Sequence, residues 1–252
     1  MLLGLQGSVI EQRAGYQVVR TPTNPTFYWG NFLVLGGPPA PGTVSSWIST
    51  FAREFPGAEH VALGVDSTDG AAGDQPELAA AGLAVERNTV LAAGTTDPPP
   101  HPNETAQFRM LDRDADWLAA LELQEAVYPD GEPEGWEGFQ GRRLQAKRQM
   151  QAQGFGAWFG AFQAGRMVSG LGVFSDGSGI ARFQDVDTHP DHRNQGLAGT
   201  LVYQAGQHAR KEMAAQTLVI VAEPLGPAIR IYRSVGFRDA ETQVQLQRQP
   251  PS

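Results

Sequence analysis

The most informative segment of the sequence reads Asp187-Thr-His-Pro-Asp-His-Arg-Asn-Gln-Gly-Leu-Ala-Gly199. Within it, Arg193, Gly196 and Ala198 fit the pattern (Gln or Arg)-x-x-Gly-x-(Gly or Ala). A turn of this kind between a strand and a helix leaves several backbone N–H groups pointing one way, at the positive end of the helix dipole. Such a turn can bind a pyrophosphate group, although a glycine turn before a helix is more often only a turn.

The elements around this segment predict a mixed α/β fold. Apolar and β-branched runs predict strands, and apolar residues at helical spacing predict helices. From residue 108 onward the predicted order is strand 108–111, helix 117–127 capped by Asp114 or Asp116, helix 139–153, strands 157–162 and 167–174, strand 180–188, helix 197–213, strand 217–222, a helix from Pro227 to Gly236, and strand 242–246.

A second motif follows about 30 residues later and reads Ala228-Ile-Arg-Ile-Tyr-Arg-Ser-Val-Gly-Phe237. Together the two motifs and the order of elements closely resemble the GNAT superfamily of N-acetyltransferases over about 145 residues. The resemblance implies the GNAT fold and transfer of an acetyl group from acetyl-CoA to a primary amine of a small molecule or protein by direct attack. A non-catalytic acyl-CoA-binding sensor or scaffold is the alternative, and a transferase for larger acyl or aminoacyl groups is a weaker one.

The resemblance also implies roles for individual residues. The turn would hold the coenzyme pyrophosphate, and the end of the preceding strand would offer backbone groups to the pantetheine arm and the acyl carbonyl. Tyr232 matches the tyrosine that commonly lies near the thioester sulfur and protonates the departing thiolate, and a half-buried tyrosine that only packs is the alternative. The expected coenzyme-binding residues are Val186, Asp187, Thr188, Arg193, Asn194, Gln195, Gly196, Leu197, Ala198, Gly199 and Tyr232.

The general base is expected on strand 180–188, where Asp185 and Asp187 are the candidates. The face that each carboxylate occupies depends on a β-bulge, because one extra residue reverses the direction of the side chains after it. Both aspartates are equally compatible with a structural role, and a proton relayed by water is the default mechanism. Direct attack by an amine needs no protein nucleophile.

Two further segments bear on the site. Many GNAT relatives have an asparagine where this chain has Leu225, so one coenzyme contact is expected to be missing. The acidic segment 128–137 lies where the family shapes its acceptor pocket. Its carboxylates Asp130, Glu132, Glu134 and Glu137, with Tyr128 and Trp136, are candidates for attracting a cationic amine, and a solvated acidic loop is the favoured alternative.

Composition limits the other functional classes. The formal net charge of −8 argues against a nucleic-acid-binding surface, and zero cysteines exclude disulfides, thiolate zinc sites and cysteine nucleophiles. His189 and His192 are expected to be exposed loop residues and not ligands of a metal. The chain lacks a long apolar run and a basic signal region, so we expect a cytoplasmic protein without a membrane partner, as a monomer or homodimer.

The predicted domains are 1–99 and 107–252, joined by a proline-rich spacer at 100–106. Residues 25–99 repeat the order strand, helix, strand, helix, strand at nearly the same spacing as the second half, which predicts a smaller, degenerate GNAT-like domain. The place of the pyrophosphate turn is taken there by Gly36-Gly-Pro-Pro-Ala-Pro-Gly42. Proline has no amide hydrogen, so no coenzyme is expected in this half. An unrelated small α/β domain is the alternative.

Overall fold

The computed structural model describes residues 2–129 and 138–249 and divides them into two compact units. The C-terminal unit consists of residues 2–6 and Leu91–Asp239, and the N-terminal unit of Gly7–Val90 and residues 240–249. The predicted boundary at 99–107 differs from this division, because the later part of the final strand β11 (Arg238–Arg248) pairs with β4 (Val61–Val65) inside the N-terminal unit. The mixed α/β class and the GNAT-type order of elements agree with the prediction.

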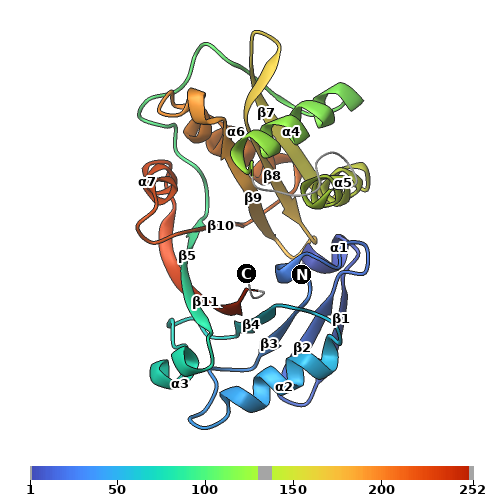
Figure 1. Ribbon diagram of the computed structural model, residues 1–252. Coiled ribbons are helices and arrows are strands. Elements are labelled where there is room, and N and C mark those ends of the chain that lie inside the picture. Colours follow the sequence, from blue (N-terminus) through green and yellow to red (C-terminus); the bar gives the residue numbers. More distant parts are fainter. Residues whose placement is uncertain (1, 130–137, 250–252) are drawn as a thin grey trace. The chain divides into compact units, whose positions relative to one another are not determined.

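A mixed sheet forms the centre of the C-terminal unit (Figure 1). Its strands lie in the order β10, β9, β8, β7, β6, and only the β9–β10 pair is parallel. Their bounds are β6 (Gln107–Met110), β7 (Gly156–Gln163), β8 (Arg166–Ser175), β9 (Ile180–Thr188) and β10 (Thr217–Ala222). Nine of the ten residues of β8 are buried, so helices must cover both faces of the sheet.

Two pairs of helices cover these faces. On one face, α4 (Asp114–Val127) and α5 (Phe139–Ala152) pack around the buried Trp117, Leu144 and Trp158. On the other, α6 (Leu197–Glu212) and α7 (Pro227–Ser234) pack on a second cluster through side chains such as Leu201, Ala205 and Ile229. The sheet therefore has two apolar layers, and β9 lies between them.

The pairing of β9 with β10 is short, and this opens the sheet. It ends at Arg182 opposite Val219, so the last six residues of β9 continue without a β10 partner. In the same stretch β9 bulges against β8, because Asp185 and Val186 together face the single residue Leu171. Asp185 has φ of +44°, a left-handed conformation that aspartate tolerates better than most residues. The bulge that sequence alone left unplaced is therefore at Asp185.

The N-terminal unit has its own hydrophobic core. Its elements are β1 (Val9–Arg13), β2 (Tyr16–Arg20), β3 (Phe32–Leu35), α2 (Val44–Glu54), β4, α3 (Gln75–Ala80) and the start of β5 (Ala84–Ala93). Strands β1, β2 and β3 are antiparallel, and β4 is parallel to β3. The order of three antiparallel strands, helix, parallel strand, helix and strand is the same as from β7 to β11. The hairpin of β1 and β2 was not predicted.

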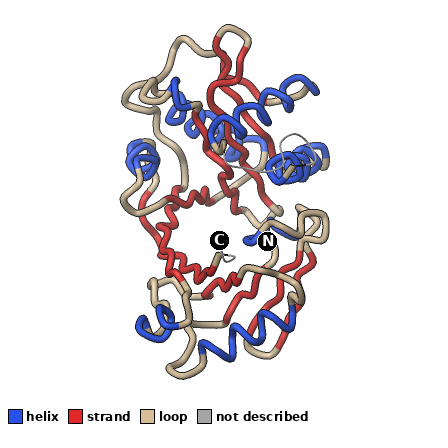
Figure 2. Tube along the Cα trace, viewed as in Figure 1, coloured by secondary structure: helices blue, strands red, loops and turns tan. Residues whose placement is uncertain are grey.

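The segment 94–106 has no helix or strand, as its prolines require, but it is not a free spacer (Figure 2). Thr96 is buried, its Oγ1 donates to the carbonyl of Tyr203 on α6, and its own carbonyl accepts from Gln207. Gly206 leaves the room for it, since a Cβ there would lie 2.5 Å from the Thr96 methyl group. At Thr96, before the predicted spacer 100–106, this segment therefore packs against α6.

Candidate active site

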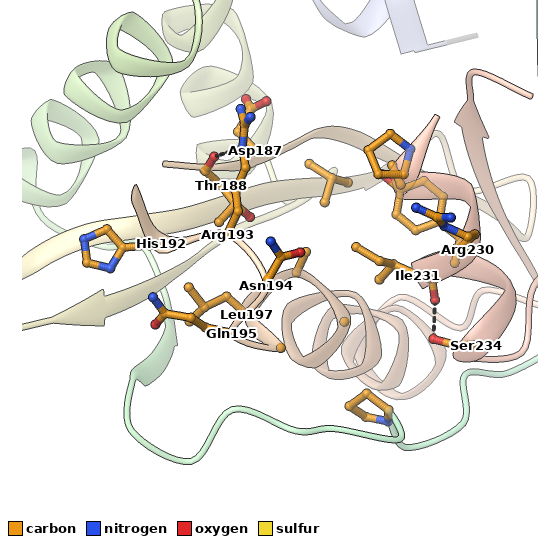
Figure 3. Close-up of a pocket in the computed structure, with 18 of the residues that line it drawn as sticks. Asp187, Thr188, His192, Arg193, Asn194, Gln195, Leu197, Arg230, Ile231 and Ser234 are labelled. Carbon is orange, nitrogen blue, oxygen red and sulfur yellow. Dashed lines mark hydrogen bonds between the residues drawn. The ribbon is translucent and has the colours of Figure 1, made fainter. Parts of the chain in front are cut away.

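A cavity of about 880 Å³ lies in the C-terminal unit where β9 and β10 separate. Its walls come from the end of β9, the turn before α6, one face of α7, the end of α4 and the segment Pro99–His101 (Figure 3). All the residues predicted to bind the coenzyme, including Tyr232, line this cavity. Asp185 does not line it.

The turn before α6 presents a run of unpaired main-chain donors. Within the described residues, the amides of 194–199 donate no hydrogen bond, and the first helical bond is from Thr200 N to Gly196 O. Asn194 and Gly196 have positive φ values of 60° and 76°, which wind the chain so that successive amides are left exposed. These donors stand at the N-terminus of a 16-residue helix, where the dipole favours negative charge. The turn fits a pyrophosphate group.

Glycine is required at position 196 for a second reason. A Cβ there would lie 2.3 Å from the carbonyl oxygen of His101, so the segment before β6 packs directly against the turn. Asn103 fixes this contact, because its Nδ2 donates to Gln195 O at 2.8 Å and its main-chain N donates to Thr200 Oγ1 at 2.9 Å. Sequence reasoning missed this wall of the cavity, since its contacts with the turn join residues more than 90 positions apart.

The two candidate bases on β9 have opposite surroundings. The Asp185 carboxylate forms ion pairs with two residues of α5, Lys147 and Arg143. The Nη2 of Arg143 lies 2.9 Å from Oδ1 of Asp185. Burial acts to raise the pKa of Asp185, but the charges of Arg143 and Lys147 outweigh it and hold this pKa well below its usual range. Asp185 is thus a paired carboxylate that ties the bulge to α5.

Asp187 is buried, with 5% of its surface exposed. Its Oδ1 accepts a hydrogen bond of 3.0 Å from the hydroxyl group of Tyr128 at the end of α4. Its Oδ2 is buried and has no partner among the described residues. Burial, with a smaller contribution from the charge of Asp185, raises the pKa of Asp187 to about 6. This is the range suited to a group that exchanges protons near neutral pH.

Tyr232 on α7 is also buried and lines the cavity. Burial raises its pKa above the ordinary value, and the charge of Asp187 adds to the effect. The phenol therefore stays protonated across the pH range in which the protein would work. Asp187 on β9 and Tyr232 on α7 thus line one cavity, and the charge of Asp187 acts on the Tyr232 phenol.

Comparison with known proteins assigns the segment that lines most of this cavity to a protein family. Residues 117–237 match the model described as the acetyltransferase (GNAT) family, and the matched range contains β9, the turn, α6 and α7. This part of the chain is a GNAT acetyltransferase domain. No curated protein sequence matches the chain.

Solved structures extend the similarity in fold over nearly the whole chain. A GCN5-related N-acetyltransferase from Kribbella flavida has a TM-score of 0.65 at 19% identity and covers 100% of this chain and 93% of its own. A functionally unknown conserved protein from Staphylococcus epidermidis has a TM-score of 0.69 at 9% identity and covers 97% and 95%. A tandem GNAT protein from the clavulanic acid biosynthesis pathway has a TM-score of 0.55 at 16% identity and covers 94% and 83%. At these identities the likeness shows the fold alone.

Other predicted features of the GNAT domain differ in detail. His189 and His192 are half-buried instead of exposed, because His192 Nδ1 lies 2.9 Å from Gln163 Oε1 and His189 Nδ1 accepts from Asp191 N. No group of three potential metal ligands occurs within residues 2–129 and 138–249. Leu225 is fully exposed and does not line the cavity.

The acidic segment is only partly described. Asp130, Glu132, Glu134, Trp136 and Glu137 lie outside the described residues. Tyr128 is described, and it lines the cavity next to Val127. Across the described part of the chain, no helix has the length and apolar character needed to cross a membrane.

Proposed function

We propose that the GNAT domain transfers an acetyl group from acetyl-CoA to a primary amine of a small molecule or a protein. The observation that carries this proposal is the run of free amides at 194–199, which opens into the same cavity as Asp187 and Tyr232. An anionic coenzyme and a proton-accepting carboxylate would thus have places in one cavity, which supports acetyl transfer there.

The acetyl donor would be held chiefly by backbone groups. The amides of 194–199 would bind the pyrophosphate, with Arg193 supplying a positive charge beside them. The separation of β9 from β10 leaves Val186–Thr188 without a β10 partner on the side away from β8, and this side would receive the pantetheine arm and the acyl carbonyl. A fixed backbone donor on a developing oxyanion typically lowers the barrier by about 2–4 kcal/mol.

The chemical step needs one proton acceptor and one donor to sulfur. The neutral amine attacks the thioester carbonyl carbon, so a C–N bond forms and the C–S bond breaks. The nitrogen loses a proton to Asp187, directly or through water, and the thiolate gains one to give free CoA and the acetylated amine. No other reactant is needed.

We assign the base to Asp187 and not to Asp185. Asp185 is held as an anion between two cations and is therefore a poor proton acceptor. Asp187 has an unpartnered oxygen, and its raised pKa means that it binds a proton more readily at neutral pH. Replacing it should reduce turnover by about 10²-fold or more, in line with the loss of a general base.

Tyr232 is proposed to donate a hydrogen bond to the leaving sulfur. The raised pKa makes complete transfer of the phenolic proton less favourable than for an ordinary tyrosine. The thiolate would then receive its final proton from solvent or from protonated Asp187, with Tyr232 stabilising the charge meanwhile. This modifies the expected role of a full proton donor.

The N-terminal unit is proposed to be a degenerate copy without a coenzyme. Its elements follow the same order as those of the GNAT domain, but Pro38, Pro39 and Pro41 stand in the loop between β3 and α2. Each proline removes one amide donor from the place where a pyrophosphate would bind. We therefore expect one coenzyme site per chain.

The test is an amine screen with acetyl-CoA that follows release of the CoA thiol. Wild-type protein should acetylate at least one small amine or peptide, and Asp187→Asn should reduce the rate by about 10²-fold or more. The matched control is Asp176→Asn in the β8–β9 turn, which should behave like wild type. Binding of acetyl-CoA with no turnover across the panel would favour the sensor or scaffold alternative.

A further inference from the structure

Tyr128 has an unusual orientation for a tyrosine near the surface. Its side chain is partly exposed, with 47% of the residue surface accessible, yet its hydroxyl group is bonded to the buried Asp187 carboxylate. A partly exposed tyrosine more commonly buries its ring and directs its hydroxyl group to water. The main chain of Tyr128 is fixed by the last turn of α4, through a 2.9 Å bond from its N–H to Gln124 O. The hydroxyl is thus held on Asp187 from a defined anchor.

Asp187 has few other partners. Asp185 on the same strand contributes a like charge, Arg143 and Lys147 on α5 contribute positive charges, and Tyr232 on α7 is a neutral phenol. Both α5 cations are engaged with Asp185. Among the described residues, Tyr128 is the one hydrogen-bond donor to the Asp187 side chain.

We infer that Tyr128 is a positioning residue for Asp187: by holding Oδ1 it fixes the carboxylate, so that Oδ2 remains the single oxygen available to accept a proton. This inference deepens the proposed function and rests on it for its catalytic meaning. A carboxylate with two equivalent free oxygens can rotate, whereas one with a bonded oxygen presents the other in one direction.

The bond also sets the acidity of Asp187. The hydrogen bond from Tyr128 stabilises the ionised carboxylate and opposes the effect of burial. Removing the hydroxyl group leaves both oxygens without a donor, so the protonated form becomes more favourable and the pKa rises. A hydrogen bond to a charged group corresponds to a shift of about one unit or more.

The experiment is a pH titration of aspartate carboxyl carbons by ¹³C NMR on the full chain without ligand. The resonance of Asp187 is the one missing from Asp187→Asn, and it should titrate near pH 6 in wild type. In Tyr128→Phe the midpoint should move upward by about one unit or more. Tyr203→Phe makes the same chemical change on α6, away from the cavity, and should leave the midpoint in place.

An unchanged midpoint in Tyr128→Phe would overturn the inference, as would an Asp187 carboxyl that does not titrate between about pH 4 and 8. Should Tyr128→Phe fold poorly, Tyr128→Leu also lacks the hydroxyl group and should move the midpoint in the same direction, and an unchanged midpoint there would likewise overturn the inference. In the transfer reaction, Tyr128→Phe should shift the acidic limb of the kcat–pH profile to higher pH. The KM for acetyl-CoA should change little. Because the NMR result needs no turnover, failure of the inference and failure of the proposed reaction are separable.

Discussion

Asp185 and Asp187 show how two like residues on one strand acquire different chemistry. They are two positions apart on β9. Asp185 lies in the β-bulge, whereas Asp187 follows the bulge and pairs with Gly170 of β8. Asp185 pairs with two cations of α5, whereas Asp187 is buried and its carboxylate accepts a hydrogen bond from the Tyr128 phenol. The sequence could name both candidates but not choose between them, because the choice depends on the α5 residues that pair with one of them.

The burial of Asp187 should lower the free energy of unfolding at neutral pH relative to a protein in which this carboxyl group is uncharged. The pKa of Asp187 is higher in the folded than in the unfolded protein. The loss of stability is therefore absent below about pH 4, where Asp187 is protonated in both states, and complete above about pH 6. The shift corresponds to about 2–3 kcal/mol. Asp187→Asn should therefore gain stability relative to wild type at pH 7 but not at pH 4, as measured by urea unfolding. An equal difference at both values would contradict this account of the site.

A substitution of Tyr232 should affect the chemical step and not the binding of acetyl-CoA. Its hydroxyl is proposed to act on the sulfur that becomes charged during the reaction, so Tyr232→Phe should reduce kcat by about 10²-fold. The affinity for acetyl-CoA should change by less than about twofold, since the pyrophosphate contacts are made by the turn before α6. Steady-state kinetics and titration calorimetry measure the two effects. A loss of affinity as large as the loss of kcat would show that Tyr232 serves binding instead.

At the scale of elements, local patterns predicted much of the GNAT domain. The helix α6 and the strands β7, β8 and β10 have strong apolar patterns, and Gly196 with Arg193 marked the turn, because these signals are local. The opening between β9 and β10 and the hydrogen bond from Tyr128 to Asp187 were not predictable, since they join segments that are distant in sequence. The contacts of Thr96 and Asn103 with α6 and the turn before it were not predictable for the same reason, whereas the absence of regular structure in the segment 94–106 followed from its prolines.

The contact of this segment with the turn gives an element-scale prediction. Asn103 binds the carbonyl of Gln195, and its side-chain oxygen also accepts from the amides of Thr105 and Ala106. Asn103→Ala should loosen the turn and weaken acetyl-CoA binding by about tenfold, which corresponds to about 1.4 kcal/mol. Asn88→Ala on β5 is the matched control and should bind as wild type does. Equal affinities in calorimetry for the two variants would exclude a role for the segment in binding.

At the scale of the whole molecule, the two units repeat one order of elements, and we propose that only one of them binds the coenzyme. Both have three antiparallel strands, a helix and a parallel strand, followed by a helix and a strand. In the GNAT domain the amides of 194–199, at the turn and in the first residues of α6, donate no hydrogen bond among the described residues, whereas Gly36–Gly42 contains three prolines. The central claim is therefore that each chain binds one acetyl-CoA, at the N-terminus of α6.

Isothermal titration of the full chain with acetyl-CoA tests this claim most directly. Wild type should bind with micromolar affinity at one site per chain. Gly196→Trp should weaken binding by about 10²-fold or more, because a side chain at this position meets the His101 carbonyl and covers the amides. Ser178→Trp, at an exposed turn position, should bind as wild type does. Two sites per chain, or binding unaffected by Gly196→Trp, would contradict the account.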